Sequence, residues 1–166
     1  MFLRFFLCLV VCGGSALLAW VFLDRELVAF FASRDADAEA MTLAREWAHS
    51  IARSNKVVIS GFHSPIEREV YRILDAYHRP VVVALARSLY RKIPPIFESA
   101  CRENRVLFVS LRDTSRTSFS TAHARNWYVA DIASEVVFAP FRERSSLSTL
   151  HYTLCVTHSA KVSVLE

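Results

Sequence analysis

The sequence predicts an α/β fold, with a mainly parallel sheet of about six strands and helices on both faces. From residue 27 onward, short apolar runs rich in valine alternate with longer segments of helical periodicity. This alternation is typical of successive strand–helix–strand units. One of the runs, residues 80–86, is apolar without interruption, as a strand buried on both faces of a parallel sheet requires. At 166 residues, the chain has the length of one ordinary domain with a short additional segment.

The first half of the domain contains three expected strands, at 27–32, 56–60 and 80–86. Between the first two, residues 36–53 repeat apolar side chains at three- and four-residue steps, which predicts an amphipathic helix. The next helix begins with the strongest local signal of the chain. Ser64, Pro65 and Glu67 combine an N-cap serine, a proline at the first helical position and the acid of a capping box. We expect this helix to end near residue 77.

The second half repeats the pattern with three more strands, at 105–110, 135–139 and 161–165. Three helices are expected beside them: one opened by Pro94-Pro95 and ending at about 104, one from about 120 to 134, and one over 146–158. We expect the aromatic side chains on the helices to belong to the core rather than to a base-stacking platform, because they recur at helical spacing: Trp47, Trp127 and Tyr128.

Residues 5–23 precede this domain and contain no charged side chain. As a helix they would span about 28 Å, close to the thickness of a bilayer core. We therefore divide the chain into an N-terminal hydrophobic segment, 1–26, and a domain, 27–166. The segment is expected to form an apolar helix that anchors the domain in a membrane, with the domain facing the cytoplasm. A cleaved signal peptide or a mis-assigned start remains open, and without an anchor the protein would be cytoplasmic.

Composition excludes several kinds of site. Only three glycines are present, two of them within the apolar N-terminal segment, so neither a dinucleotide-binding glycine fingerprint nor a Walker loop can form. The four cysteines show no paired spacing, and His123, His151 and His158 have no partners at metal-ligand spacing, so no metal or other cofactor is expected. The net charge of +4 is a mild excess that does not by itself indicate nucleic acid.

Ligands of open parallel sheets bind beyond the carboxyl ends of the strands. The residues that follow the strands here are mostly hydroxyls and guanidiniums: Ser33, Arg34, Ser60, Gly61, Arg87, Ser88, Ser110, Arg112, Arg142, Arg144, Ser145 and Ser146. Such groups at helix starts favour a phosphate-bearing ligand, although serine also caps helices and arginine also solvates loops. His63 and Glu67 are four residues apart and form a candidate acid–base pair, with a simple helix-end interaction as the alternative.

Four pieces of the sequence, in this order, resemble the DprA/Smf family of DNA-processing proteins. They are Ser60-Gly61 opening a helix; Arg87 leading to Ile93-Pro94-Pro95; Ala124-Arg125-Asn126 before a helix and strand; and Arg144-Ser145-Ser146-Leu147-Ser148-Thr149. The resemblance spans residues 27–165 and implies a Rossmann-like fold, in the group that includes the cytokinin-activating phosphoribohydrolases. The arginine and second glycine of the family's loop are absent, and Ser146 stands where the family has glycine.

The resemblance implies a module, rather than an enzyme, that binds a nucleotide or single-stranded DNA. Its phosphate-binding residues would be Ser60, Gly61, Ser64, Arg87, Arg125, Asn126, Ser145 and Ser146. Family membership would also imply a recombinase as partner and a possible homodimer. Two alternatives remain open. One is a small nucleotide or N-glycosidic-bond hydrolase that uses Glu67, and the other is a degenerate scaffold at the membrane whose ligand site is vestigial.

Overall fold

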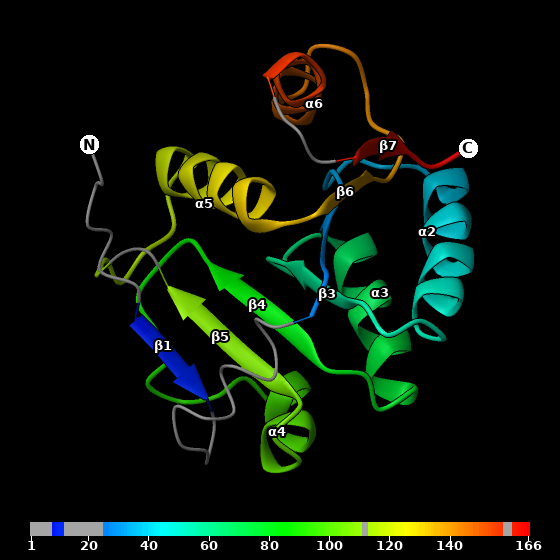
Figure 1. The fold of residues 1–166 in the computed structure, drawn as a ribbon. Helices are drawn as coiled ribbons and strands as arrows, with labels where there is room; N and C mark the ends of the chain where they lie inside the picture. The colour runs from blue at the N-terminus through cyan, green and yellow to red at the C-terminus, as the bar shows by residue number, and fades with distance from the viewer. Residues whose placement is uncertain (1–7, 12–24, 111–112, 158–160) are drawn as a thin grey trace.

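The computed structural model describes residues 8–11, 25–110, 113–157 and 161–166. Its centre is a seven-stranded sheet of order β1-β5-β4-β3-β2-β6-β7 (Figure 1). The strands are β1 (Cys8–Val11), β2 (Leu27–Phe31), β3 (Val57–Ser60), β4 (Val81–Leu85), β5 (Val106–Ser110), β6 (Glu135–Phe138) and β7 (Lys161–Val164). The helices are α2 (Ala38–Ile51), α3 (Pro65–Ala76), α4 (Pro95–Arg102), α5 (Phe119–Ile132) and α6 (Ser146–Thr157).

The six strands from β2 to β7 are all parallel, which confirms the predicted sheet. Each of them lies within a residue or two of the range expected from the sequence. The central strands are buried over their whole length, because helices cover both faces and leave no position exposed to water.

Helices cover both faces of the sheet, as predicted. Alternate residues of β2 point to opposite faces, so Val28 and Phe30 belong to one core and Ala29 and Phe31 to the other. The first core receives side chains from α2, α3 and α4, and the second receives side chains from α5 and α6. Trp47, Trp127 and Tyr128 pack against these cores, as their helical spacing indicated.

The N-terminal segment differs from its prediction where the structure describes it. Residues 8–11 were expected within an apolar helix, but they form β1, which pairs antiparallel with β5 at the edge of the sheet (Figure 1). The edge of β5 offers unpaired backbone N–H and C=O groups, and a short run of leucine and valine can satisfy them as a strand. Residues 12–23 lie outside the described part of the chain. Among the helices that are described, none combines the length and apolar character needed to cross a bilayer.

The strand order creates a crevice at one place along the carboxyl edge of the sheet. The chain proceeds from β2 through β3 and β4 to β5 in one direction, and then returns to place β6 on the other side of β2. The segments that follow β2 and β6 therefore leave toward opposite faces, into α2 and α6. Ligands of open α/β sheets bind at such a switch point.

Candidate anion-binding pocket

A pocket of about 260 Å³ opens at this switch point. Four segments line it: the loop after β2, the start of α3, the middle of α5 and the start of α6. The lining residues are Ala32, Ser33, Arg34, Asp35, His63, Ser64, Glu67, Arg125, Asn126, Ser146 and Leu147. Two helices, α3 and α6, thus begin at the pocket, and they differ in which groups accept hydrogen bonds from the N–H groups of their first turns.

The start of α3 is closed by its own carboxylate. Ser64 and Glu67 form the predicted capping box, in which the Ser64 hydroxyl accepts from the Glu67 N–H at 3.1 Å. The Glu67 carboxylate accepts in return from the N–H groups of Ser64 at 3.1 Å and His63 at 2.8 Å. Its second oxygen accepts from the N–H of Ala32, at the end of β2, at 3.3 Å. Glu67 is only 4% exposed, so it holds two strand exits together from within the fold.

The turn between β3 and α3 is fixed by packing. Phe62 adopts a left-handed conformation with φ of 51°, which is unusual for a residue with a large side chain. Its N–H donates to the buried Ser60 hydroxyl at 3.3 Å, and its ring packs edge-on against Tyr71 with centroids 5.4 Å apart. Because both the ring and the hydroxyl are buried, the surrounding core holds this strained backbone in place.

Arg125 of α5 lies directly over Gly61. A Cβ on Gly61 would come within 2.6 Å of the guanidinium carbon of Arg125, so any side chain at this position would displace the guanidinium. Arg125 is 7% exposed, and its Nε and Nη2 donate to the amide oxygen of Asn126 at 3.0 and 2.8 Å. Its third nitrogen, Nη1, is buried without a hydrogen-bond partner. Burial, opposed by the nearby Glu67 carboxylate, lowers the pKa of Arg125 from its usual value.

His63 lies beside this guanidinium on the pocket wall, and its Nε2 is also buried without a partner. Burial lowers the pKa of His63 to about 4, and four arginines add to the effect: Arg125, Arg68, Arg34 and Arg87. The imidazole is therefore neutral at neutral pH, within a region of positive potential.

The start of α6 is open, in the sense that no carboxylate in the described part of the chain accepts from its backbone N–H groups as Glu67 does at α3. Ser145 caps it by accepting from the N–H of Ser148 at 3.1 Å, and its first turn contains no acidic side chain. Ser146 and Leu147 lie on the pocket wall, and the first N–H groups of a helix have no acceptor within the helix. The positive end of the α6 dipole thus faces the pocket.

Of the eight phosphate-binding residues that the family resemblance implied, the pocket brings together four, namely Ser64, Arg125, Asn126 and Ser146. Two of the strand-exit residues, Ser33 and Arg34, line it as well. The other four of the eight lie beside it. Ser60 is buried behind the turn, Gly61 lies under Arg125, Ser145 serves as a cap, and Arg87 stacks over the Tyr90 ring at 5.7 Å. Arg112, one of the strand-exit residues, lies outside the described part of the chain.

Sequence reasoning did not select His63 and Asp35 as ligand-binding residues, although the structure places both on the pocket wall. It also expected a phosphate at the start of α3, where the Glu67 carboxylate accepts from the N–H groups of His63 and Ser64. The signal that could have located the open site is the first turn of α6, which contains serines and no acid.

The arrangement suits an anion. It combines a buried guanidinium nitrogen without a partner with the open start of a helix, and further arginines surround it. Within the described residues, no three histidine, cysteine or acidic side chains come together as a metal site requires. The Glu67 carboxylate is occupied by three backbone N–H groups, so its oxygens are engaged in structural contacts.

Comparisons with known proteins bear on the fold. No family model matches the sequence. A search of curated proteins likewise found no significant match. Solved structures do match, among them one concerning the single-stranded DNA binding mode of DNA processing protein A from Helicobacter pylori. Its TM-score is 0.74 at 16% identity, over 95% of this chain and 70% of that one.

Two further structures are similar. DNA processing protein A from Streptococcus pneumoniae has a TM-score of 0.67 at 15% identity, over 86% of this chain and 59% of that one. The molybdenum cofactor carrier protein from Chlamydomonas reinhardtii has a TM-score of 0.54 at 10% identity, over 84% of this chain and 76% of that one. The chain thus spans between about three fifths and three quarters of these structures. Its fold is that of a DprA-like, Rossmann-like α/β domain.

Proposed function

We propose that this chain binds a nucleotide or single-stranded DNA, with a phosphate group held in the pocket between Arg125 and the start of α6. The observation that carries the proposal is the Nη1 atom of Arg125, a buried donor on the pocket wall that has no partner. A buried donor without an acceptor costs about 1–3 kcal/mol, and a phosphate oxygen would remove that penalty. The likeness to DprA structures supports nucleic acid as the source of the phosphate.

The electrostatics favour the same ligand class. Arg34, Arg68, Arg87 and Arg125 all act on His63 of the pocket wall. These four guanidiniums come from two helices, α3 and α5, and from the two loops that follow β2 and β4. Glu67 is close to them, but its charge is satisfied by backbone N–H groups. The site is therefore prepared for an additional negative charge.

The test is binding of the full chain to a fluorescently labelled single-stranded oligothymidylate, with mononucleotides as competitors. We expect affinity to fall steeply with salt, because each phosphate contact releases counterions. Arg125→Ala should weaken binding at least tenfold. Arg34→Ala should weaken it several-fold without a risk to folding, since Arg34 is exposed.

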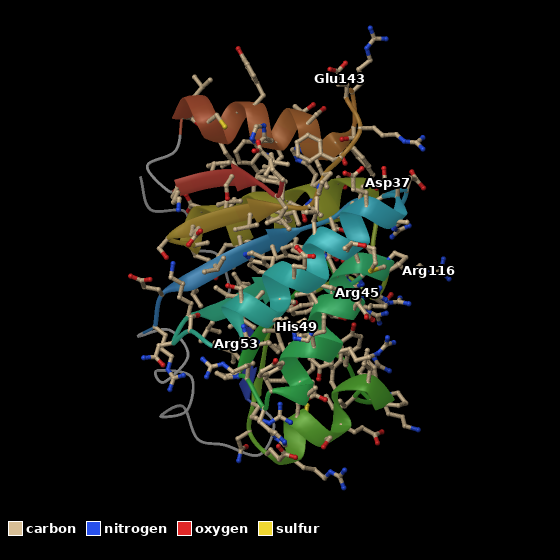
Figure 2. All side chains as sticks on the ribbon, turned by 90° about the vertical axis from the view of Figure 1, so that its right-hand side faces the viewer. Asp37, Arg45, His49, Arg53, Arg116 and Glu143 are labelled. Atoms are coloured by element: carbon tan, nitrogen blue, oxygen red, sulfur yellow. The ribbon has the colours of Figure 1, made fainter. Side chains whose placement is uncertain are left out.

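Arg53→Ala is the matched control, because Arg53 is exposed and follows the end of α2, whereas the pocket-lining loop, 32–35, precedes the start of that helix. Figure 2 shows Arg53 and Asp37 at opposite ends of α2. Oligonucleotide binding that a mononucleotide does not displace identifies single-stranded DNA as the ligand, and full displacement identifies the nucleotide. Equal affinity of wild type and Arg125→Ala for all these ligands would contradict the proposal.

No specific observation favours the two alternative functions. A hydrolase would need a free Glu67 carboxylate, and Glu67→Gln that kept any turnover would remove this residue from the mechanism. A vestigial scaffold would show no rise in melting temperature with any of these ligands. A cytoplasm-facing domain, a recombinase partner and a homodimer stay predictions. Membrane association through residues 5–23 is not supported by the described part of that segment, because Cys8–Val11 pair with β5 in the sheet.

A further inference from the structure

The pocket wall contains a second buried polar atom without a partner, Nε2 of His63. It lies close to the first, Nη1 of Arg125. Both side chains approach the same point above Gly61, the position that a Cβ on this residue would occupy. The guanidinium carbon of Arg125 lies 2.6 Å from that point, and Cδ2 of His63, the ring carbon bonded to Nε2, lies 3.0 Å from it. One oxygen of a bound anion could therefore reach both side chains.

Charged groups face His63 from every element that packs around it. They are Arg125 on α5, Arg68 and Glu67 on α3, Arg34 and Asp35 after β2, and Arg87 after β4. The pocket residues of α6, Ser146 and Leu147, have no titratable side chain. Four guanidiniums thus face two carboxylates, one of which is already engaged by backbone N–H groups.

We propose that His63 is a further ligand of the anion and binds it as the imidazolium, so that occupation of the pocket takes up one proton from solution. The proton goes to Nε2 of the neutral ring, and the resulting Nε2–H donates to the anion oxygen that Arg125 also contacts. This inference rests on the proposed function and adds a regulation to it, namely that acid conditions tighten binding.

The physical reason is a change in the potential at the ring. In the empty pocket, burial and the arginines hold the pKa of His63 near 4. A bound anion offsets the arginines and accepts a hydrogen bond from the charged ring, and both effects raise this pKa. Linkage then requires the affinity to rise as pH falls, by up to about tenfold per pH unit for one proton.

The first experiment follows the His63 ring of the full chain by NMR from pH 3.5 to 8, in chloride and in sulfate. Sulfate serves as the probe because it does not titrate in this range. His63→Gln assigns the signal. We expect an apparent pKa near 4 in chloride that sulfate raises by at least one unit. His49 is the internal control, because it is exposed on α2, and its signal should not respond to sulfate (Figure 2).

The second experiment measures binding of an oligothymidylate without terminal phosphates, by calorimetry in two buffers with different heats of ionisation. Its phosphodiesters do not titrate between pH 5 and 8, so proton uptake reports on the protein. Wild type and His49→Gln should take up a measurable fraction of a proton on binding at pH 5.5 and should bind more tightly than at pH 7.5. His63→Gln should bind without uptake and with little dependence on pH.

The two experiments separate the two proposals. Oligonucleotide binding without proton uptake, or uptake that survives His63→Gln, overturns the role of His63 and leaves the proposed function standing. A sulfate shift of the His63 signal without any oligonucleotide binding supports the histidine as an anion ligand and overturns nucleic acid as the ligand. A His63 signal that does not respond to sulfate overturns the inference in either case.

Discussion

Two helices begin at the same pocket, and they differ in how the first turn is satisfied. At α3, Pro65 has no N–H to offer, and the Glu67 carboxylate accepts from the backbone on both sides of the crevice. At α6, the cap is the neutral Ser145, no acid occupies the first turn, and Ser146 and Leu147 line the pocket.

The difference shows that a helix start is not an anion site by virtue of its dipole alone. The α3 start already holds a negative charge that belongs to the protein, so it contributes stability. The α6 start faces the unpartnered nitrogen of Arg125, so it is the one available to a ligand. Changes at the closed start should therefore act on folding, and changes at the open start should act on binding.

The largest expected effect comes from opening the closed start. Glu67→Ala leaves the N–H groups of Ala32, His63 and Ser64 without their acceptor, which should lower the free energy of unfolding by about 3 kcal/mol. Urea denaturation measures this loss. Glu46→Ala, an exposed acid on α2, is the matched control and should change stability by less than about 0.5 kcal/mol. Equal effects of the two substitutions would contradict the structural role of Glu67.

Acid should lower the free energy of unfolding through His63, which lies at the start of α3. The native pKa of about 4 lies below the unfolded value of 6.5, so between these values the unfolded chain binds a proton that the native state does not. The free energy of unfolding should therefore fall as pH decreases from 6.5 to 4, by about 2 kcal/mol from this group. Denaturation across this range should show a shallower fall for His63→Gln than for His49→Gln. Parallel curves for the two variants would exclude a perturbed His63.

Gly61→Ala, in the turn that leads into α3, should weaken anion binding between Arg125 and the start of α6. Its Cβ would displace the Arg125 guanidinium, so anion affinity should fall about tenfold, which corresponds to about 1.4 kcal/mol. The control is a double-mutant cycle with Arg125→Ala, which removes the clashing group. In that background, Gly61→Ala should leave both stability and residual affinity almost unchanged. An additive cycle would show that the glycine is needed for another reason.

The smallest effect is expected from a substitution that gives the start of α6 the proline found at the start of α3. Ser146→Pro places proline at the first position of α6, as Pro65 does at α3, and removes one N–H from the pocket wall. Proline is tolerated there, so stability should change by less than about 0.5 kcal/mol. Affinity for the oligonucleotide should fall about threefold in the binding assay. Unchanged affinity would show that the α6 backbone does not contact the ligand.

Local signals predicted much of this molecule. The six parallel strands follow from apolar runs of five or so residues, and the α3 start follows from Ser64, Pro65 and Glu67 within four positions. Arg125 and Asn126, which were selected as ligand-binding residues, lie on the pocket wall. These signals depend on neighbours in the chain, which a sequence displays directly.

Contacts between segments that are distant in the chain could not be predicted from the sequence. Glu67 appeared as a capping residue, and nothing near it in the sequence indicates its bond to Ala32, 35 positions away. Residues 8–11 have the apolar character of a membrane helix, and only the free edge of β5 shows why they form a strand. His63 was selected as half of an acid–base pair or as a helix-end residue, and only the fold shows the four arginines that act on it.

The sequence by itself determined the class of fold and the edge of the sheet at which the candidate pocket lies, because strand and helix periodicity and strand exits are local properties. Its scarcity of glycine also left Gly61 as the single glycine of the domain. Only the tertiary structure decided which helix start remains open. That choice depends on where β6 and α5 pack, since Arg125 over Gly61 and Glu67 across the crevice set the charge that the pocket presents.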